Sequence, residues 1–194
     1  MYAALPFPFH TSSEHTIDRP LFSAESHTVP GEIGGDQFAV VSMMIQPCAA
    51  EVNHIFEELL NGWQGGVEND KQECQAVGSL AVDGEDQKGA ETTSSKRILS
   101  DELFSTYMLI PDGAAYYHYD GGLTTPPCSE VVWWNLADKP VTVSVGQYAQ
   151  LVDQIINFIS TDTCTAGTFA GPAGSTSRPT VALNGRTVDR ICPA

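Results

Sequence analysis

Residues 117–134 read YHYDGGLTTPPCSEVVWW, and this stretch does most to decide the fold. It joins an aromatic cluster, a glycine pair, two threonines, two prolines and an apolar run that ends in tryptophan. Pro126 and Pro127 fix φ and remove two backbone donors, so the loop is stiff. Thr125 precedes a proline and is pushed towards an extended backbone. Taken alone, the stretch predicts a proline-stiffened turn that presents a threonine hydroxyl at the mouth of a sheet.

Three stretches of the chain resemble the motifs of one family, the α-carbonic anhydrases. Tyr119 to Trp134 resembles the family signature, with Gly122 where serine is usual. Residues 9–18 (FHTSSEHTID), followed by AESH at residues 24–27, resemble the family's metal-site segments. Residues 178–186 are similar to its closing strand. The motifs occur in the family's order and span nearly all of the chain.

The resemblance implies an α+β, β-dominated fold, in which a central, twisted, mostly antiparallel sheet carries peripheral helices. We expect residues 1–194 to form a single domain of this kind. The family's first third, which carries its usual proton-shuttle histidine, has no counterpart, so the fold is expected to lack its N-terminal part. A sheet shortened in this way would expose edges and core. We therefore expect a protein partner to cover it, for example in a larger membrane-associated assembly.

The metal site implied by the resemblance is incomplete. The family binds zinc with three histidines, and His10 and His27 fall on the second and third ligand positions. The first position falls on Pro8, which cannot coordinate a metal. Catalytic zinc usually takes three protein ligands and a water molecule. We therefore expect zinc to be weakly bound or absent.

Other site residues are carried over from the same resemblance. It implies that Glu25 orients a ligand histidine, as carboxylates commonly do around metal sites. The catalytic set implied by the resemblance is Glu14, Thr124 and Tyr119, with Glu14 and Thr124 forming a hydrogen-bond relay; the substrate pocket is lined by Leu123, Thr125 and Trp134. From the residues alone, Glu14 could equally be a surface carboxylate and Thr124 a plain turn residue. A lone histidine on a strand is more often a hydrogen-bonded core residue than a ligand.

Composition excludes several classes of function. The chain has 194 residues, 42% of them hydrophobic, which is enough for a sizeable core. Its formal net charge is −15, which argues against nucleic-acid binding and against docking on anionic lipid by charge. No run is long and apolar enough to cross a bilayer. The first ten residues lack the pattern of a secretory signal.

Five cysteines favour an oxidising compartment, although five reduced thiols in a cytosolic protein remain an alternative. Cys164 and Cys192 bracket a small-residue tail and are a candidate pair, as are Cys48 and Cys74. The resemblance implies that Cys128 is unpaired, because its usual family partner belongs to the missing segment. We expect a secreted or organelle-lumenal protein whose targeting signal is not present in this chain.

The remaining pattern places strands and helices around these motifs. A nearly continuous apolar run at residues 37–45 predicts a buried strand. Apolar residues at helical spacing predict a helix over residues 51–61 that ends at Gly62, and a polar loop over residues 63–75. Ser144 and Gln147 resemble a capping box that opens a second helix after a strand at residues 140–145. Residues 84–95 and 163–177 are expected to be a loop and a linker.

Two main functional hypotheses follow. The first is a carbonic-anhydrase-like domain with an incomplete zinc site and little or no activity, which serves as a structural or interaction subunit. The second is an active zinc enzyme that hydrates CO2 to bicarbonate, with His10, His27 and an unexpected third ligand. A third hypothesis is that Pro8 is a sequence error near a false start, in which case the native protein is an ordinary carbonic anhydrase. The ligand count favours the first.

Overall fold

The computed structural model describes residues 9–18, 21–32, 37–48, 52–80, 106–160, 163–167 and 174–193. Pro8, which stands at the first ligand position of the resemblance, lies outside the described residues, as does the loop expected at residues 84–95. No helix in the described part of the chain is long and apolar enough to cross a bilayer.

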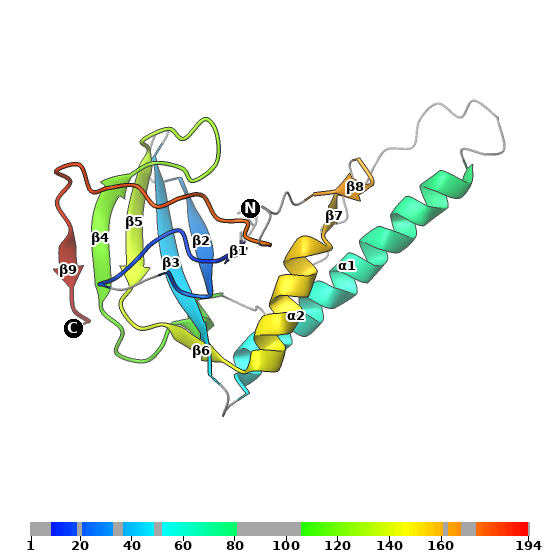
Figure 1. Cartoon of the computed structure of the whole chain (residues 1–194), viewed down its shortest axis with the longest axis horizontal. Coiled ribbons are helices and arrows are strands. Elements are labelled where there is room, and N and C mark those ends of the chain that lie inside the picture. Colours follow the sequence, from blue (N-terminus) through cyan, green and yellow to red (C-terminus); the bar gives the residue numbers. More distant parts are fainter. Residues whose placement is uncertain are drawn as a thin grey trace.

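A mixed, twisted sheet forms the centre of the molecule (Figure 1). Its strands follow the order β1 (Phe9–Thr11), β2 (Ala24–Glu32), β3 (Phe38–Pro47), β5 (Val132–Ala137), β4 (Tyr116–Gly121) and β9 (Asp189–Ile191), and β6 (Val141–Val143) also pairs with β3. Among these described strands, β3 pairs in parallel with β5 and β6, and the other ladders are antiparallel. The expected sheet, mostly antiparallel, is confirmed.

Two apolar clusters lie on opposite faces of this sheet. Side chains alternate along a strand, so Met43 and Ile45 of β3 face one cluster while Val40 and Met44 face the other. β3 is therefore buried on both sides, which explains its nearly continuous apolar sequence. Each large apolar side chain buried in this way contributes about 1.5–3 kcal/mol to folding.

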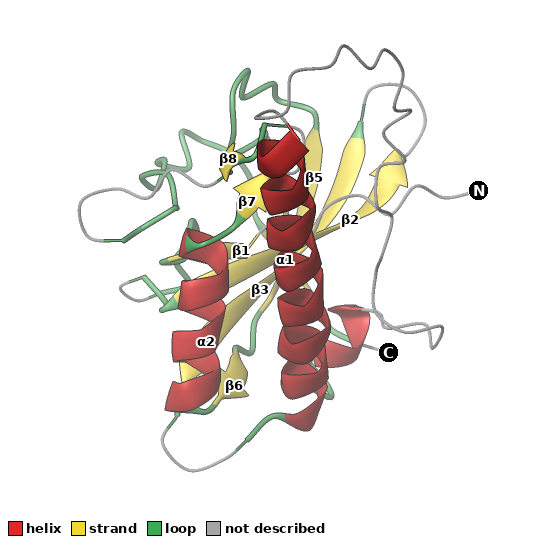
Figure 2. Ribbon diagram, turned by 90° about the vertical axis from the view of Figure 1, so that its right-hand side faces the viewer, coloured by secondary structure: helices red, strands yellow, loops and turns green. Residues whose placement is uncertain are grey.

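The two long helices of the described chain cover the same face of the sheet. Figure 2 shows α1 (His54–Leu80) and α2 (Val145–Ile156) side by side in front of the sheet. Phe56 and Leu60 of α1 and Leu151 of α2 are fully buried in the cluster that contains Met43 and Ile45. The opposite face is thus free of these helices, and it carries the candidate site.

The helix α1 is much longer than the sequence pattern predicts. A helix ending at Gly62 and a loop over residues 63–75 were both wrong expectations, because α1 continues to Leu80. Trp63 stacks on Phe9 with ring centroids 5.5 Å apart, and Val67 is 7% exposed. An interior glycine costs a helix about 1 kcal/mol, which packing of this kind offsets.

The start of α2 matches the sequence expectation. The Ser144 side chain accepts a hydrogen bond from the Gln147 amide at 3.1 Å, and the Gln147 side chain accepts one from the Ser144 amide at 3.0 Å. The Gln147 side chain also bonds both backbone groups of Asn53, just before α1. The capping box therefore holds the two helix starts together.

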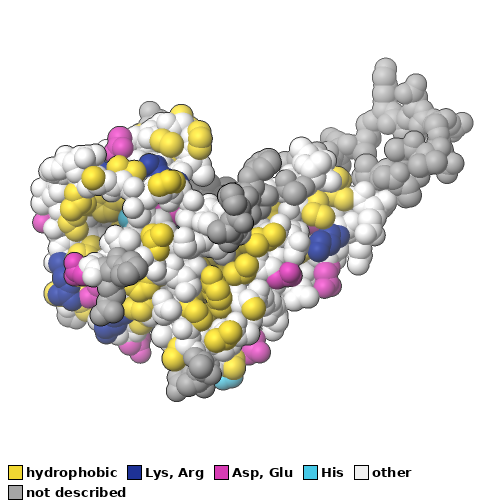
Figure 3. All heavy atoms as spheres, in the orientation of Figure 1, with side chains coloured by type: hydrophobic (Ala, Val, Ile, Leu, Met, Phe, Trp, Pro, Cys, Tyr) yellow, Lys and Arg dark blue, Asp and Glu magenta, His cyan; other side chains and the backbone are white. Residues whose placement is uncertain are grey.

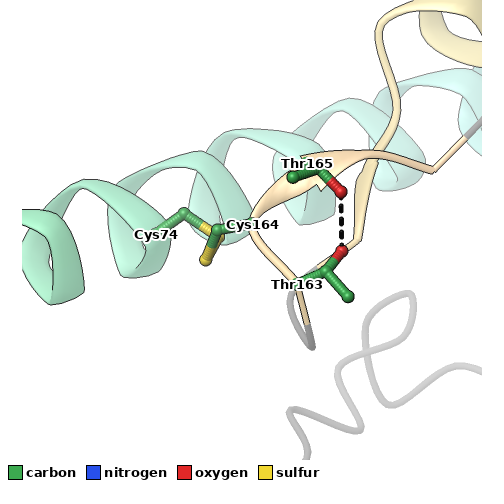
Figure 4. Close-up of a disulfide and its surroundings, with 4 residues drawn as sticks. All are labelled: Cys74, Thr163, Cys164 and Thr165. Carbon is green, nitrogen blue, oxygen red and sulfur yellow. Dashed lines mark hydrogen bonds between the residues drawn. A yellow bond between two sulfur atoms is a disulfide. The ribbon is translucent and has the colours of Figure 1, made fainter.

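The disulfide differs from both predicted pairs. Cys74 of α1 is bonded to Cys164, with a Cα–Cα distance of 5.4 Å (Figure 4). The predicted pairs Cys164–Cys192 and Cys48–Cys74 were wrong, because the extension of α1 carries Cys74 to the small hairpin of β7 (Ile159–Ser160) and β8 (Thr165–Ala166). Thr163 and Thr165 share a hydroxyl hydrogen bond of 2.8 Å across the turn that presents Cys164. Exposed free thiols are present at Cys48, Cys128 and Cys192.

The C-terminal segment returns along the edge of the sheet. Thr11 of β1 donates its amide to the Thr176 side chain and accepts a hydrogen bond from the Thr176 amide. The closing strand expected at residues 178–186 is not formed, and β9 begins only at Asp189. A turn at Asn184 and Gly185, both with positive φ, interrupts it. A short 3-10 helix, η1 (Thr106–Leu109), leads towards β4.

Candidate metal centre

The alternation of two neighbouring strands brings His10, Glu25 and His27 to one face of the sheet. His10 of β1 lies opposite Glu25 of β2, and His27 follows two residues later on β2. The rings of His10 and His27 are 4.7 Å apart between centroids, and these residues are 7% and 3% exposed. The two predicted ligand positions therefore meet in a buried place on the face that the helices leave free.

Glu25 is the centre of a dense hydrogen-bond network. Its Oε2 accepts the backbone amides of Glu14 at 2.7 Å and His15 at 2.9 Å. Its Oε1 lies 2.6 Å from His15 Nδ1, 2.7 Å from His27 Nε2 and 2.5 Å from the Ser42 hydroxyl, which donates to it. A fully buried carboxylate with this many donors is stable as the anion.

This network fixes the hydrogens on the two histidine rings. Because the Glu25 carboxylate only accepts, His27 Nε2 and His15 Nδ1 are the protonated nitrogens. His15 Nε2 is then an acceptor for the Tyr119 hydroxyl at 2.6 Å. His27 keeps its Nδ1 lone pair free of this network, as a ligand histidine held by a carboxylate does. The role predicted for Glu25, orienting a ligand histidine, is compatible with this geometry.

Burial and neighbouring charges shift three groups at the site. Burial alone would raise the pKa of the Glu25 carboxyl, but hydrogen bonds from His15 and His27 outweigh it and hold this pKa well below 4.5. Burial, aided by His27 and opposed by Glu14, lowers the pKa of His10 and favours its neutral ring. Burial raises the pKa of the Tyr119 hydroxyl, against the opposing effect of Arg186, so this hydroxyl stays protonated and donates to His15.

Two buried polar atoms of this cluster have no hydrogen-bond partner among the described residues. They are His10 Nε2 and Glu14 Oε2. Glu14 Oε1 accepts the Arg178 amide at 2.9 Å and lies 3.3 Å from His10 Nδ1. One ligand atom from each of His10, Glu14 and His27 lies within 4.8 Å of the others, so two imidazoles and a carboxylate are available to a cation such as zinc.

A second group of possible ligands is explained by hydrogen bonding. His15, Glu25 and His27 also lie within metal-binding range of one another. Both His15 nitrogens are engaged, one by Glu25 and the other by Tyr119. Glu25 Oε1 is shared by three side chains. These hydrogen bonds fix the positions of the three side chains beside His10.

No further histidine reaches the centre. The chain has five histidines, and all of them are described. The His54 side chain is 86% exposed at the start of α1. His118 lies between two pocket-lining tyrosines on β4, so it points to the other face, where its Nδ1 is 3.0 Å from Asn135 Oδ1.

A pocket of about 500 Å³ opens beside the buried histidines. Glu14, Thr124 and Tyr119, the predicted catalytic set, all line it. The predicted relay bond between Glu14 and Thr124 is not among the hydrogen bonds of the described residues. Arg178 and Arg186 also line the pocket, and Arg186 lies over the Tyr119 ring at 5.7 Å.

The three residues predicted to form the substrate pocket are not among the residues that line it. The Trp134 ring is 4.8 Å from both His15 and His27, and its Nε1 donates to the Gly122 carbonyl at 3.1 Å. Leu123 packs into the apolar cluster of this face, and Thr125 is exposed. The Trp134 ring thus packs against the rings of both histidines.

Sequence reasoning missed two residues of the network. His15 bridges Glu25 and Tyr119, and Ser42 donates to Glu25. His15 belongs to the FHTSSEHTID segment, and that membership was the available signal. Nothing in the apolar run of β3 marks Ser42, whose role comes from its register opposite His27.

The sequence matches the eukaryotic-type carbonic anhydrase family over residues 1–191. It is 30% identical over 144 residues to a carbonic anhydrase from Pectobacterium carotovorum, covering 74% of this chain and 47% of that protein. It is 32% identical over 139 residues to carbonic anhydrase 3 from Sus scrofa, covering 72% and 46%. The chain spans about half the length of these relatives.

The structure resembles that of carbonic anhydrase Cah3 from Chlamydomonas reinhardtii in complex with acetazolamide. The TM-score is 0.60 at 23% sequence identity, over 95% of this chain and 63% of that one. This likeness supports the fold. The match of the family model over residues 1–191 shows that this chain belongs to the eukaryotic-type carbonic anhydrase family.

Proposed function

We propose that this protein is a single-domain, carbonic-anhydrase-related protein with little or no CO2 hydration activity, which serves as a structural or interaction subunit. The observation that carries the proposal is the ligand count. Three of the five histidines lie at the centre, but both nitrogens of His15 are hydrogen-bonded, so His10 and His27 are the histidines available as ligands. Pro8, at the first ligand position of the resemblance, offers no donor atom. Two histidines alone would hold zinc weakly.

The chain's own residues support low activity in a second way. A bound zinc ion would supply an activated water for attack on CO2. Glu14 and Thr124 would have to hold and orient the hydrogen of that water. Glu14 Oε1 instead accepts the Arg178 amide and lies near His10 Nδ1. Oε1 of Glu14 is therefore already engaged by two neighbouring residues and is not available to a water molecule.

An active carbonic anhydrase is the second candidate. The hydrogen bonds that link Glu25, His15 and Tyr119 are formed, and His10 Nε2 has no hydrogen-bond partner among the residues that the structure describes. Arg178 and Arg186 line the pocket of an otherwise acidic chain, where they would attract an anion such as bicarbonate.

The substitution Pro8→His discriminates between the two candidates. We expect the wild-type protein, loaded with zinc, to hydrate CO2 near the uncatalysed rate in a stopped-flow assay. Pro8→His adds the missing imidazole and is expected to raise the rate at least tenfold. The matched control is Pro6→His, two residues earlier, which should leave the rate unchanged. A fast wild-type protein that gains nothing from Pro8→His would favour the active candidate.

An interaction role needs a partner, and the sheet offers a surface for one. Figure 3 shows hydrophobic side chains exposed at the end of the molecule that carries β9. Exposed apolar residues of this segment include Val181, Leu183 and Ile191, which are 54%, 56% and 52% exposed. β9 is also an edge strand, open to pairing. We propose that a protein partner docks here.

The Cys74–Cys164 disulfide supports the proposal that the protein is secreted or organelle-lumenal, because disulfides persist in oxidising compartments. Chemical cross-linking of cells that express the protein, followed by native mass spectrometry of the purified product, is expected to find the chain joined to a second protein. Detection of free monomer alone would contradict the interaction role.

A further inference from the structure

We infer that Glu14 is the third ligand of a rebuilt metal centre, in which His10, His27 and Glu14 hold a divalent transition-metal ion such as zinc. The inference deepens the proposed function and rests on it, because a carboxylate that binds the metal is no longer available as a catalytic relay. It replaces the ligand that Pro8 cannot supply with a residue that the fold already holds beside both histidines.

The first support is the burial of unpartnered atoms. The side chains of His10 and Glu14 are 9% and 3% exposed, and within the described part of the chain His10 Nε2 and Glu14 Oε2 have no hydrogen-bond partner. A buried donor or acceptor that is left unsatisfied loses its solvation without compensation, and the loss is larger for a charged group. Two of them in neighbouring side chains indicate that a ligand belongs between them.

The second support is the arrangement of the three side chains. One ligand atom from each lies within 4.8 Å of the other two. In a tetrahedral zinc site with bonds of about 2.0–2.1 Å, ligand atoms lie about 3.4 Å apart. Modest side-chain rotation can therefore close the site, and two histidines with one glutamate are an established zinc ligand set.

The third support is that the surrounding bonds leave the required atoms free. Glu25 engages His27 through Nε2, so the His27 Nδ1 lone pair stays available. The Arg178 amide anchors Glu14 through Oε1 and leaves Oε2 unbound. The anionic Glu14 also reduces the charge of a divalent cation in this buried place.

The competing explanation is that Glu14 only forms an ion pair with His10. Their contact, Nδ1 to Oε1, is 3.3 Å long. This pairing uses neither of the two unpartnered atoms, so it leaves the burial cost in place. A metal ion held through His10 Nε2, Glu14 Oε2 and His27 would engage both.

The test measures metal binding by the full chain with any affinity tag removed. Zinc stoichiometry is measured by elemental mass spectrometry after dialysis, and zinc affinity by titration. The visible spectrum of the Co2+-loaded protein reports the coordination geometry. The variants are Glu14→Gln, which keeps the size and the Oε1 acceptor, and His10→Ala. The matched control is Glu130→Gln, which changes another carboxylate of the same pocket outside the proposed ligand set.

We expect about one zinc per wild-type chain and a four-coordinate Co2+ spectrum. Glu14→Gln is expected to weaken zinc binding by at least about 100-fold, since losing even an indirect partner of a ligand costs 10–100-fold. His10→Ala should abolish binding, and Glu130→Gln should leave it unchanged. If circular dichroism shows that Glu14→Gln is unfolded, Glu14→Asp serves instead. Its shorter side chain keeps the charge but moves the carboxylate oxygens away from the two histidines.

Two outcomes would overturn the inference: a wild-type chain that binds no zinc, or Glu14 variants that bind as tightly as the wild type. A CO2 hydration assay on the same samples separates this inference from the proposed function. Zinc bound through Glu14 with high activity would contradict the proposed function alone. No zinc and no activity would contradict the inference alone.

Discussion

Glu25 shows how one buried charge can organise a site. Its carboxylate is fully buried, yet two backbone amides, two histidines and one serine surround it. These donors offset the loss of solvation that burial imposes on an anion. The same contacts set the orientation of His27 and place His15 against Tyr119. The metal centre thus depends on a residue that has no place in the proposed ligand set.

Replacing this carboxylate is expected to destabilise the fold. Glu25→Gln keeps the size but removes the charge that pairs with two histidines, and it should lower the free energy of unfolding by about 3 kcal/mol. Chemical denaturation of metal-free protein measures this. The exposed Glu58 of α1 provides the control, because Glu58→Gln is expected to change stability by less than about 0.5 kcal/mol.

The same residue predicts a pH dependence. Because the folded-state pKa of Glu25 is held below 4.5, its contribution to stability is fully present above that pH and is lost as the pH falls below it. In metal-free protein, the difference in melting temperature between the wild type and Glu25→Gln should become smaller as the pH is lowered from about 5. Parallel curves for the two proteins would contradict this assignment.

Part of the site could be predicted from residues and part could not. The motif resemblance identified His10, His27 and Glu25, and the structure brings all three together. It gave no sign that Glu14 lies within metal-binding range of both histidines, because that depends on where the chain places Glu14 after β1 ends. Nor did it reveal Ser42, which is defined by strand register.

At the scale of elements, the start of α2 is coupled to the start of α1. Gln147 completes the capping box with Ser144 and also bonds the backbone of Asn53. Ser144→Ala removes one cap and should cost about 1 kcal/mol. Gln147→Ala also leaves groups at the start of α1 unpaired, so a cost of about 2 kcal/mol is expected. Urea denaturation measures both, and equal costs would show that the helices are not coupled in this way.

The disulfide ties the far part of α1 to the β7–β8 hairpin across 90 residues of sequence. Cross-links of this span typically stabilise a protein by about 2–4 kcal/mol. We expect Cys74→Ser, Cys164→Ser and the double variant each to lower the free energy of unfolding by the same amount, about 3 kcal/mol. Cys48→Ser, which changes a free thiol, is the control. Additive losses in the double variant would mean that the two sulfurs act separately.

Local sequence signals succeeded for some elements and failed for others. The capping box at Ser144 is a local device, and the structure contains it. The end of α1 was misplaced because Gly62 is a local stop signal, whereas Trp63 and Val67 extend the helix through contacts with distant parts of the fold. The disulfide prediction failed for the same reason, since the position of Cys74 depends on that extension.

At the scale of the whole molecule, the sheet has the helix-covered apolar core on one face and the candidate site on the other. The helices and the larger apolar cluster lie on one face, and the candidate metal centre with its pocket lies on the other. Family motifs were sufficient to predict this sheet, because they mark residues on both β2 and the β4–β5 hairpin. The course of the C-terminal segment was not predictable, since it crosses the site face mainly as a loop before β9.

The central claim is that this fold retains a metal centre but has lost most of its hydration chemistry. It is tested most directly by stopped-flow measurement of CO2 hydration by the zinc-loaded wild-type chain, with bound zinc quantified in the same sample. The account predicts bound zinc and a rate within about tenfold of the uncatalysed reaction, because two histidines and a committed glutamate replace the usual three-histidine site. A rate several orders of magnitude above the uncatalysed one would contradict it.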